Sequence, residues 1–95
     1  MYQPETTITD PENLPDYLQE AVESIAEHVH DMWAAGRMRE GWTYAAHLDE
    51  EAKTHPCLRP YEELSKAEQD YDRRTDAQTI ACLLRMGYRI EPAGR

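Results

Sequence analysis

Residues 26–61 read AEHVHDMWAAGRMREGWTYAAHLDEEAKTHPCLRPY, and this stretch decides how the chain folds. It contains both tryptophans and all four histidines of the protein. It begins as the second half of a predicted helix, which Gly41 ends because glycine readily takes the left-handed conformation that closes a helix. A short extended piece and a Pro-bounded turn follow. We therefore expect this stretch to connect two helices.

The first helix is predicted to run from Pro15 to about Arg39. Proline suits the first helical position, because its missing N–H would have no intrahelical partner. Gly36 weakens the last turn. Apolar residues recur at steps of three and four, which predicts a buried face made of Leu18, Val22, Ile25, Val29 and Trp33, widened by Ala26 and Met32.

The connection after Gly41 begins with an alternating pattern. Apolar residues at 42, 44, 46 and 48 predict a short strand over residues 42–48. Residues 49–54 are charged and indicate a surface loop or a single helical turn. Pro56 and Pro60 then favour an extended, turn-rich link.

The second helix begins with Ser65-Lys-Ala-Glu68, a capping box in which the serine and glutamate side chains each bond a free backbone amide. It is predicted to reach about Met86, and Gly87 ends it. The buried side of this helix is predicted to consist of Ala67, Tyr71, Ala77, Ile80, Ala81 and Leu84, and Cys82 is expected on the same side. After the helix, residues 88–90 would form a brief strand or a hydrophobic clasp.

These elements predict a mainly α fold, with two long antiparallel helices and a short extended or β segment and turn-rich connection between them. Helices of about 20–25 residues are about 30–37 Å long. In a chain of 95 residues, such helices can cover their apolar faces only against each other. We expect a flexible N-terminal arm over residues 1–11, a domain over 12–90 and a tail over 91–95.

The composition is strongly acidic, with 19 acidic residues against 10 basic ones and a net charge of -9. Residues 1–36 contain no Lys or Arg. This argues against nucleic-acid binding, which needs clustered cations. No apolar run is long enough for a bilayer and no signal peptide is recognisable, so we expect a cytoplasmic protein without a membrane partner. A Cys57–Cys82 disulfide stays open, since two cysteines at this spacing are weak evidence.

The order of several motifs resembles the ryanodine receptor repeat domain (RyR domain), in the single-copy form found in bacteria and phages. The specific combination is AE-x-x-H-x-x-W, then GW-x-Y, then HP-x-L-x-PY. It covers roughly residues 12–90, and the matching positions are Leu14-Pro15, Ala26-Glu27, His30, Trp33, Gly41-Trp42, Tyr44, His55-Pro56, Leu58, Pro60-Tyr61, Leu64, Asp72 and Gly87-Tyr88.

The resemblance implies a mostly helical, non-catalytic domain. In calcium-release channels the domain occurs as tandem pairs at the periphery of the cytosolic assembly, but the resemblance does not make this chain a channel. Two positions depart from the family pattern. Ala45 stands where glycine usually follows the tyrosine, and Gln69 stands where lysine commonly follows the glutamate.

A candidate ligand site follows from residues near Gly41. His30, Trp33 and Arg37 share one helical face at steps of three and four. After the turn, the aromatic residues Trp42 and Tyr44 can fold back beside them. Aromatic faces stack on planar groups, and arginine pairs with phosphate or carboxylate. We predict a small anionic or nucleotide-like ligand; the alternative is that Trp33 and Trp42 are core and that His30 is a buried histidine with its hydrogen bonds satisfied. The predicted site consists of His30, Trp33, Arg37, Trp42, Tyr44, Tyr61 and Arg73.

Other chemistry is not indicated. His28 and His30 are two apart on a helix and cannot share a metal, so no metal or other cofactor is expected. No nucleophile is recognisable, so we expect no enzyme activity. The competing hypothesis is a protein-interaction or assembly domain that acts through its acidic surface. A homodimer is also expected, through an apolar patch made of Met38, Leu48, Leu58 and Ile90.

Overall fold

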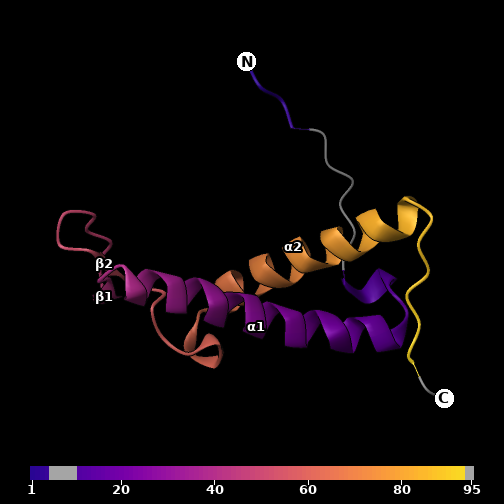
Figure 1. The fold of residues 1–95 in the computed structure, drawn as a ribbon, viewed down its shortest axis with the longest axis horizontal. Coiled ribbons are helices and arrows are strands. Elements are labelled where there is room, and N and C mark those ends of the chain that lie inside the picture. Colours follow the sequence, from indigo (N-terminus) through magenta and orange to yellow (C-terminus); the bar gives the residue numbers. More distant parts are fainter. Residues whose placement is uncertain (5–10, 94–95) are drawn as a thin grey trace.

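The computed structural model describes residues 1–4 and 11–93. Two long helices, α1 (Asp16–Arg39) and α2 (Lys66–Arg85), run in opposite directions along each other (Figure 1). The expected mainly helical fold, with two long helices and a short β segment and turns between them, is confirmed. The expected arm falls largely on residues 5–10, and the end of the expected tail falls on residues 94 and 95; both lie outside the described residues. The smaller elements are η1 (Pro11–Asn13), β1 (Thr43–Tyr44), β2 (Thr54–His55) and η2 (Tyr61–Glu63).

Both helices begin and end where the sequence predicts. The capping box at Ser65 and Glu68 is formed in both directions. After α1, Gly41 has a φ of +94°, and after α2, Gly87 has a φ of +100°. These angles lie in the left-handed region, where a side chain would strain the backbone. The two glycines therefore stop the helices at Arg39 and Arg85.

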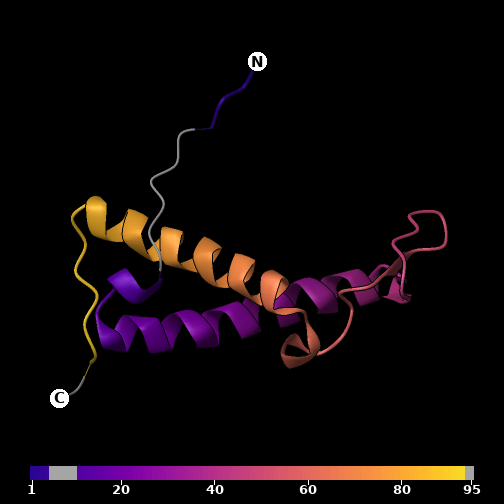
Figure 2. The same cartoon turned by 180° about the vertical axis from the view of Figure 1, so that it is seen from behind.

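One half of the core fills the space between the diverging ends of the helices. Here α1 contributes Leu18 and Val22, and α2 contributes Ala77 and Ile80. The short helix η1 lies between these ends, and the segment after α2 passes beside the N-terminal end of α1 (Figure 2). η1 thus acts as a wedge where the two helices alone would leave their apolar faces open.

The other half of the core lies where η2 packs against the middle of α1. Ala26, Tyr61 and Leu64 form this cluster, with the half-buried Cys57 against it. The small side chain of Ala26 is only 1% exposed and lets the Tyr61 ring approach the helix. The connection between the helices is therefore part of the core rather than a peripheral loop.

The buried face of α1 differs from the predicted one beyond Val22. Ile25 and Val29 are exposed, and Trp33 is only half-buried. Leu18, Val22 and Ala26 are buried as predicted, whereas Met32 is exposed, and the row continues in steps of four through small or polar side chains. The reason is the change of partner, since α2 gives way to η2, and η2 needs room for Tyr61. The observed buried face consists of Leu18, Val22, Ala26, His30 and Ala34.

On α2, the prediction was right for Ala77, Ile80 and Ala81, which are buried. It was wrong for the first turns and for the last: Ala67 and Tyr71 are exposed, as are Leu84 and Cys82. α2 diverges from α1 toward its C-terminal end, and at its N-terminal end a pocket separates the helices. Apolar residues at both ends therefore have no helix to pack against. Both cysteines are free.

The predicted strand over residues 42–48 is shorter than expected. Only Thr43 and Tyr44 form it, and they pair in parallel with Thr54 and His55. Lys53, directly before Thr54, has a φ of +57°, and this left-handed conformation helps the chain to turn back beside Thr43 and Tyr44. Residues 49–53 form turns that extend beyond the end of α1 (Figure 1).

Both helices share the same kind of entry. In each, a 3-10 turn leads to a buried leucine, Leu14 or Leu64, and a glutamine five residues later reaches back. Gln19 Nε2 donates to the carbonyl oxygen of Leu14 at 2.7 Å, and Gln69 Nε2 donates to that of Leu64 at 3.1 Å. Gln69, which departs from the family pattern, is therefore a structural residue here.

Residues 88–90 do not form a strand. Ile90 packs against the core, and its carbonyl oxygen accepts a hydrogen bond from the Tyr17 hydroxyl at 2.9 Å, as in the alternative of a hydrophobic clasp. Leu58 is buried within the monomer as well. Two of the four residues expected in a dimer patch thus close the monomer core, while Met38 and Leu48 remain exposed.

Candidate functional site

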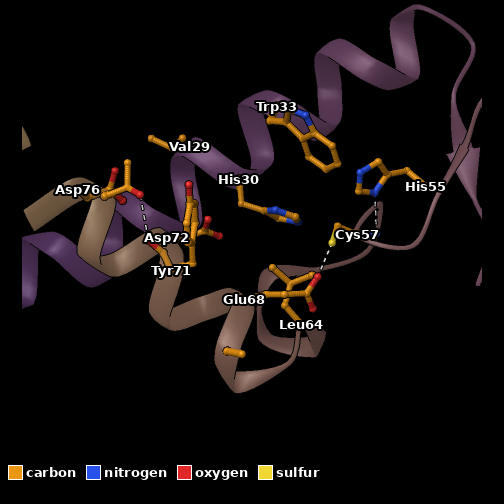
Figure 3. A pocket seen from close by; sticks show the side chains of 12 residues that line it. Val29, His30, Trp33, His55, Cys57, Leu64, Glu68, Tyr71, Asp72 and Asp76 are labelled. Atoms are coloured by element: carbon orange, nitrogen blue, oxygen red, sulfur yellow. Dashed lines mark hydrogen bonds between the residues drawn. The ribbon is translucent and has the colours of Figure 1, made fainter. Parts of the chain in front are cut away.

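A pocket of about 590 Å³ opens between α1 and the N-terminal half of α2 (Figure 3). Such a volume lies within the range typical of small-molecule sites. Three elements build it, and Figure 3 shows their side chains around the same space. α1 contributes Val29, His30 and Trp33, the connection contributes His55, Cys57 and Leu64, and α2 contributes Ala67, Glu68, Tyr71, Asp72, Thr75 and Asp76.

A row of rings extends along one side of the pocket and beyond it. The ring centroids of Trp33 and His55 are 4.9 Å apart in an edge-to-face arrangement, and His30 lies 5.7 Å from Trp33. Trp42 continues the row, 6.4 Å from His55. The row ends at Arg37, whose guanidinium carbon lies 5.0 Å from the Trp42 ring centroid, a cation–π arrangement.

The two histidines of this row are held by backbone groups. His30 is buried, and its Nε2 lies 2.7 Å from the carbonyl oxygen of Arg59. A carbonyl oxygen only accepts hydrogen bonds, so His30 Nε2 carries a proton. His55 Nδ1 accepts from the backbone N–H of Cys57 at 3.0 Å. The neutral His55 ring therefore carries its proton on Nε2.

Cys57 and Glu68 form the floor of the pocket nearest the connection. The Cys57 thiol donates to Glu68, which also accepts from the backbone and hydroxyl of Ser65. Burial, together with this bond to Glu68, raises the pKa of Cys57 to about 11. The bonds from Cys57 and Ser65 lower the pKa of Glu68. The thiol is thus protonated at neutral pH, while Glu68 is ionised.

Three carboxylates follow one another along the α2 side of the pocket. Glu68, Asp72 and Asp76 are four residues apart, so they lie on one face of the helix. Burial raises the pKa of both aspartates; the charge of Asp72 raises that of Asp76 further, and His30 partly offsets the effect at Asp72. Asp76 is 9% exposed, and its Oδ2 has no hydrogen-bond partner among the described residues.

The unpartnered carboxylate leads to a prediction about stability. Asp76→Asn should raise the free energy of unfolding at pH 7 by about 1–2 kcal/mol, because it removes a buried charge while keeping the shape. The folded-state pKa of Asp76 is above its ordinary value of 3.8. The contribution of Asp76 to the free energy of unfolding is therefore most favourable at low pH, where its carboxyl is protonated in both the folded and the unfolded protein. This contribution is lost as pH rises through the folded-state pKa.

The gain from Asp76→Asn should accordingly disappear at about pH 3, where the wild-type carboxyl is protonated. Urea denaturation at several pH values measures this difference. Asp31→Asn is the matched control, because Asp31 is exposed on α1 and does not line the pocket. An equal gain in both variants, or a loss of stability in Asp76→Asn at pH 7, would contradict the prediction.

The structure brings together four of the seven predicted site residues. His30 and Trp33 line the pocket, and Trp42 and Arg37 continue the ring row. Tyr61 contacts His30, with ring centroids 6.1 Å apart, but it is buried in the core.

Two predicted residues lie elsewhere. Tyr44 is 52% exposed, and it lines neither described pocket. Arg73 forms ion pairs with Glu23 and Asp70 outside the main pocket. Its guanidinium is thus engaged in joining α1 to α2.

Sequence reasoning missed the residues that α2 brings to the pocket. It assigned none of the three carboxylates on this helix to the site, yet the spacing of Glu68, Asp72 and Asp76 places them on one helical face. That spacing was the available signal. His55 and Cys57 gave no such signal, because only the path of the connection brings them beside Trp33.

Two further properties concern the described part of the chain. Within it, no group of His, Cys, Asp and Glu residues could hold a metal ion. Neither long helix has the apolar character that crossing a membrane requires.

The chain was also compared with known families, and the sequence model of the RyR domain matches residues 2–92. This match spans nearly the whole sequence, so the chain belongs to the RyR domain family.

Proposed function

We propose that this domain is a non-catalytic binding module and that the pocket between α1 and α2 is its ligand site. The observation that carries the proposal is the composition of the pocket. Apolar and aromatic side chains line much of it, and a few polar groups converge on the same space. This combination is typical of sites that hold small molecules, in which apolar contacts supply affinity and polar groups fix orientation.

The chemistry of the polar groups supports a binding role rather than catalysis. Cys57 has a raised pKa, and its protonated thiol donates a hydrogen bond to Glu68, so it is not a reactive thiolate. His30 Nε2 is occupied by the Arg59 carbonyl oxygen. His55 Nδ1 is occupied by the Cys57 amide. These groups are engaged in holding the connection against the helices.

An anionic, nucleotide-like ligand is a second candidate, and the stacking of Arg37 on Trp42 favours it. Among the described residues, the ion pair of Arg37 is a long one with Glu40, at 3.5 Å, so its guanidinium is available to an anion. Such a ligand would bind at the Trp42 end of the ring row. It would be repelled by the carboxylates at the other end of the pocket.

The two tryptophans allow the sites to be told apart by NMR. Trp33 lies in the pocket and Trp42 lies under Arg37, and the chain has no other tryptophan. A fragment library and a panel of nucleotides would be titrated into ¹⁵N-labelled protein, with the indole N–H signals assigned through Trp42→Phe. Pocket ligands should shift the Trp33 signal, whereas an anion stacked at Arg37 should shift mainly that of Trp42.

A blocking variant tests the pocket itself. Ala67 is exposed and lines the pocket, so Ala67→Leu should fill part of it and weaken binding at Trp33 at least about tenfold, the equivalent of roughly 1.4 kcal/mol. Ala35→Leu, at an exposed position of α1 outside the pocket, is the control. If no compound shifts the Trp33 signal, or if both variants bind equally, the pocket is not the ligand site.

The alternative of a protein-interaction domain rests on the acidic exterior. Exposed Glu20, Glu27 and Asp31 lie on α1, and the chain carries a net charge of -9. A basic partner would be attracted to such a surface, and moderate salt would weaken the complex.

The proposed homodimer would use the two residues of the expected patch that remain exposed, Met38 and Leu48. A cytoplasmic location stays part of the proposal, in keeping with two free cysteines.

A further inference from the structure

The buried carboxylate of Asp76 is the feature that the fold leaves uncompensated. A charged group out of contact with water is costly unless it is paired or hydrogen-bonded. Asp76 is nine-tenths buried, lines the pocket and has an Oδ2 atom without a partner among the described residues. Asp72, one turn earlier, lines the same pocket and adds a second negative charge (Figure 3).

Residues 1–4 and 11–93, which the structure describes, supply no permanent cation to the lining of this end of the pocket. None of the residues lining it is Lys or Arg. Two arginines lie between Asp72 and Asp76 in the sequence: Arg73 is paired with Glu23 and Asp70, and Arg74 lines the other pocket. Arg59 lies 3.9 Å from Glu68, at the other end of the carboxylate row. A bound cation would supply the charge that balances Asp72 and Asp76.

The surrounding side chains favour an organic cation over a metal ion. Val29 and Ala67 give the pocket apolar walls, and Trp33 and Tyr71 add aromatic ones. Aromatic faces attract ammonium and guanidinium groups, most strongly where water is excluded. In the described chain no cluster of His, Cys, Asp and Glu has the geometry for a metal. The net charge of -9 would also attract cations toward the protein.

We infer that the pocket binds an organic cation, whose ammonium or guanidinium group lies beside Asp72 and Asp76 and whose apolar body lies against Trp33. The inference rests on the proposed function, since it names the ligand class of the same pocket. The cationic group belongs to a free small molecule or to a lysine or arginine side chain of a partner. Both sources share the chemistry that the two aspartates recognise.

Three probes of one size and different charge test the inference. Benzylamine is a cation at pH 7, benzyl alcohol is neutral and benzoate is an anion, and each presents the same ring to Trp33. Dissociation constants are measured from the shift of the Trp33 indole signal in the intact protein. Benzylamine should bind at least about tenfold more tightly than benzyl alcohol, and benzoate should bind most weakly. The tripeptide acetyl-Gly-Lys-Gly-amide serves as the side-chain probe.

Variants locate the charge effect. Asp76→Asn and Asp72→Asn should each reduce the preference for benzylamine over benzyl alcohol several-fold, while Asp31→Asn should leave it unchanged. Urea denaturation confirms that each variant is folded before it is titrated. The tighter of benzylamine and the tripeptide indicates which source of the cation the pocket favours.

Three results would overturn the inference in distinguishable ways. If benzyl alcohol and benzylamine shift the Trp33 signal with equal affinity, the pocket binds ligands but does not select a cation. If none of the probes shifts that signal, the inference fails together with the proposed binding site. A preference for benzylamine over benzyl alcohol that survives in both aspartate variants would also overturn it, because groups other than Asp72 and Asp76 would then select the cation.

Discussion

Tyr61→Ala should lower the free energy of unfolding by about 3–5 kcal/mol, the usual loss for a fully buried aromatic side chain. Tyr61 is 4% exposed and packs with Ala26 and Leu64 where η2 meets α1. Without the ring, a cavity would remain between the connection and the helix. A domain of this size has a total stability of about 5–10 kcal/mol, so the variant should be largely unfolded in mild urea.

Tyr61→Phe is the informative control, because it keeps the ring and removes only the hydroxyl. That hydroxyl is buried and has no hydrogen-bond partner among the described residues. Burial also raises the pKa of Tyr61, in keeping with an apolar environment. The phenylalanine variant should be as stable as the wild type or more stable, since an unpaired buried polar group costs about 1–3 kcal/mol. A loss of more than about 1 kcal/mol in urea denaturation would show that the hydroxyl has a partner.

Leu18→Ala should have the second large effect, a loss of about 2–5 kcal/mol. Leu18 is 4% exposed and lies in the cluster that joins α1 to Ala77 and Ile80 of α2. Its loss would leave a cavity at the diverging ends of the helices, beside the η1 wedge. Thermal denaturation followed by circular dichroism measures the change.

The matched control for this prediction is Leu83→Ala. Leu83 is on α2 but is 40% exposed, so its truncation should cost less than about 1 kcal/mol. Both variants make the same chemical change in a helix, and only burial differs. Similar losses in the two variants would show that the buried side of α2 lies closer to Leu83 than the structure has it.

The helices and their ends could be predicted because their signals are local. Pro15, the Ser65–Glu68 capping box and the glycines after both helices act within a few residues of themselves. The mainly helical fold followed, because two long helices in a short chain have only each other to pack against. The RyR domain resemblance rested likewise on motifs that can be read in order.

The buried face of α1 could be predicted only in part beyond Val22, because from there on apolar residues are not always the buried ones. Ile25 and Val29 are apolar and exposed, while His30 is polar and buried. The path of the connection decides this, since η2 takes the place that α2 has further along. Only long-range contacts determine that path, and hydrophobic periodicity carries no information about them.

The candidate site was predictable in one half and not in the other. His30, Trp33 and Arg37 share a helical face, and the structure places all three in or beside the ring row. The α2 half depends on how the two helices face each other. The same limit explains Arg73, which was expected at the ligand and instead pairs with Glu23 across the helices.

The matching entries of α1 and α2 have a consequence for the order in which the chain can become structured. Gln19 and Gln69 bond carbonyl oxygens only five to eight residues away. Loops this short lose little entropy on closing, whereas starting a helix without such support is unfavourable. Each entry thus supplies a local nucleus for its own helix, at a cost independent of the other helix. What each helix cannot do by itself is dock against the other, and we expect this step to involve the segment that joins them and carries Trp42 and His55.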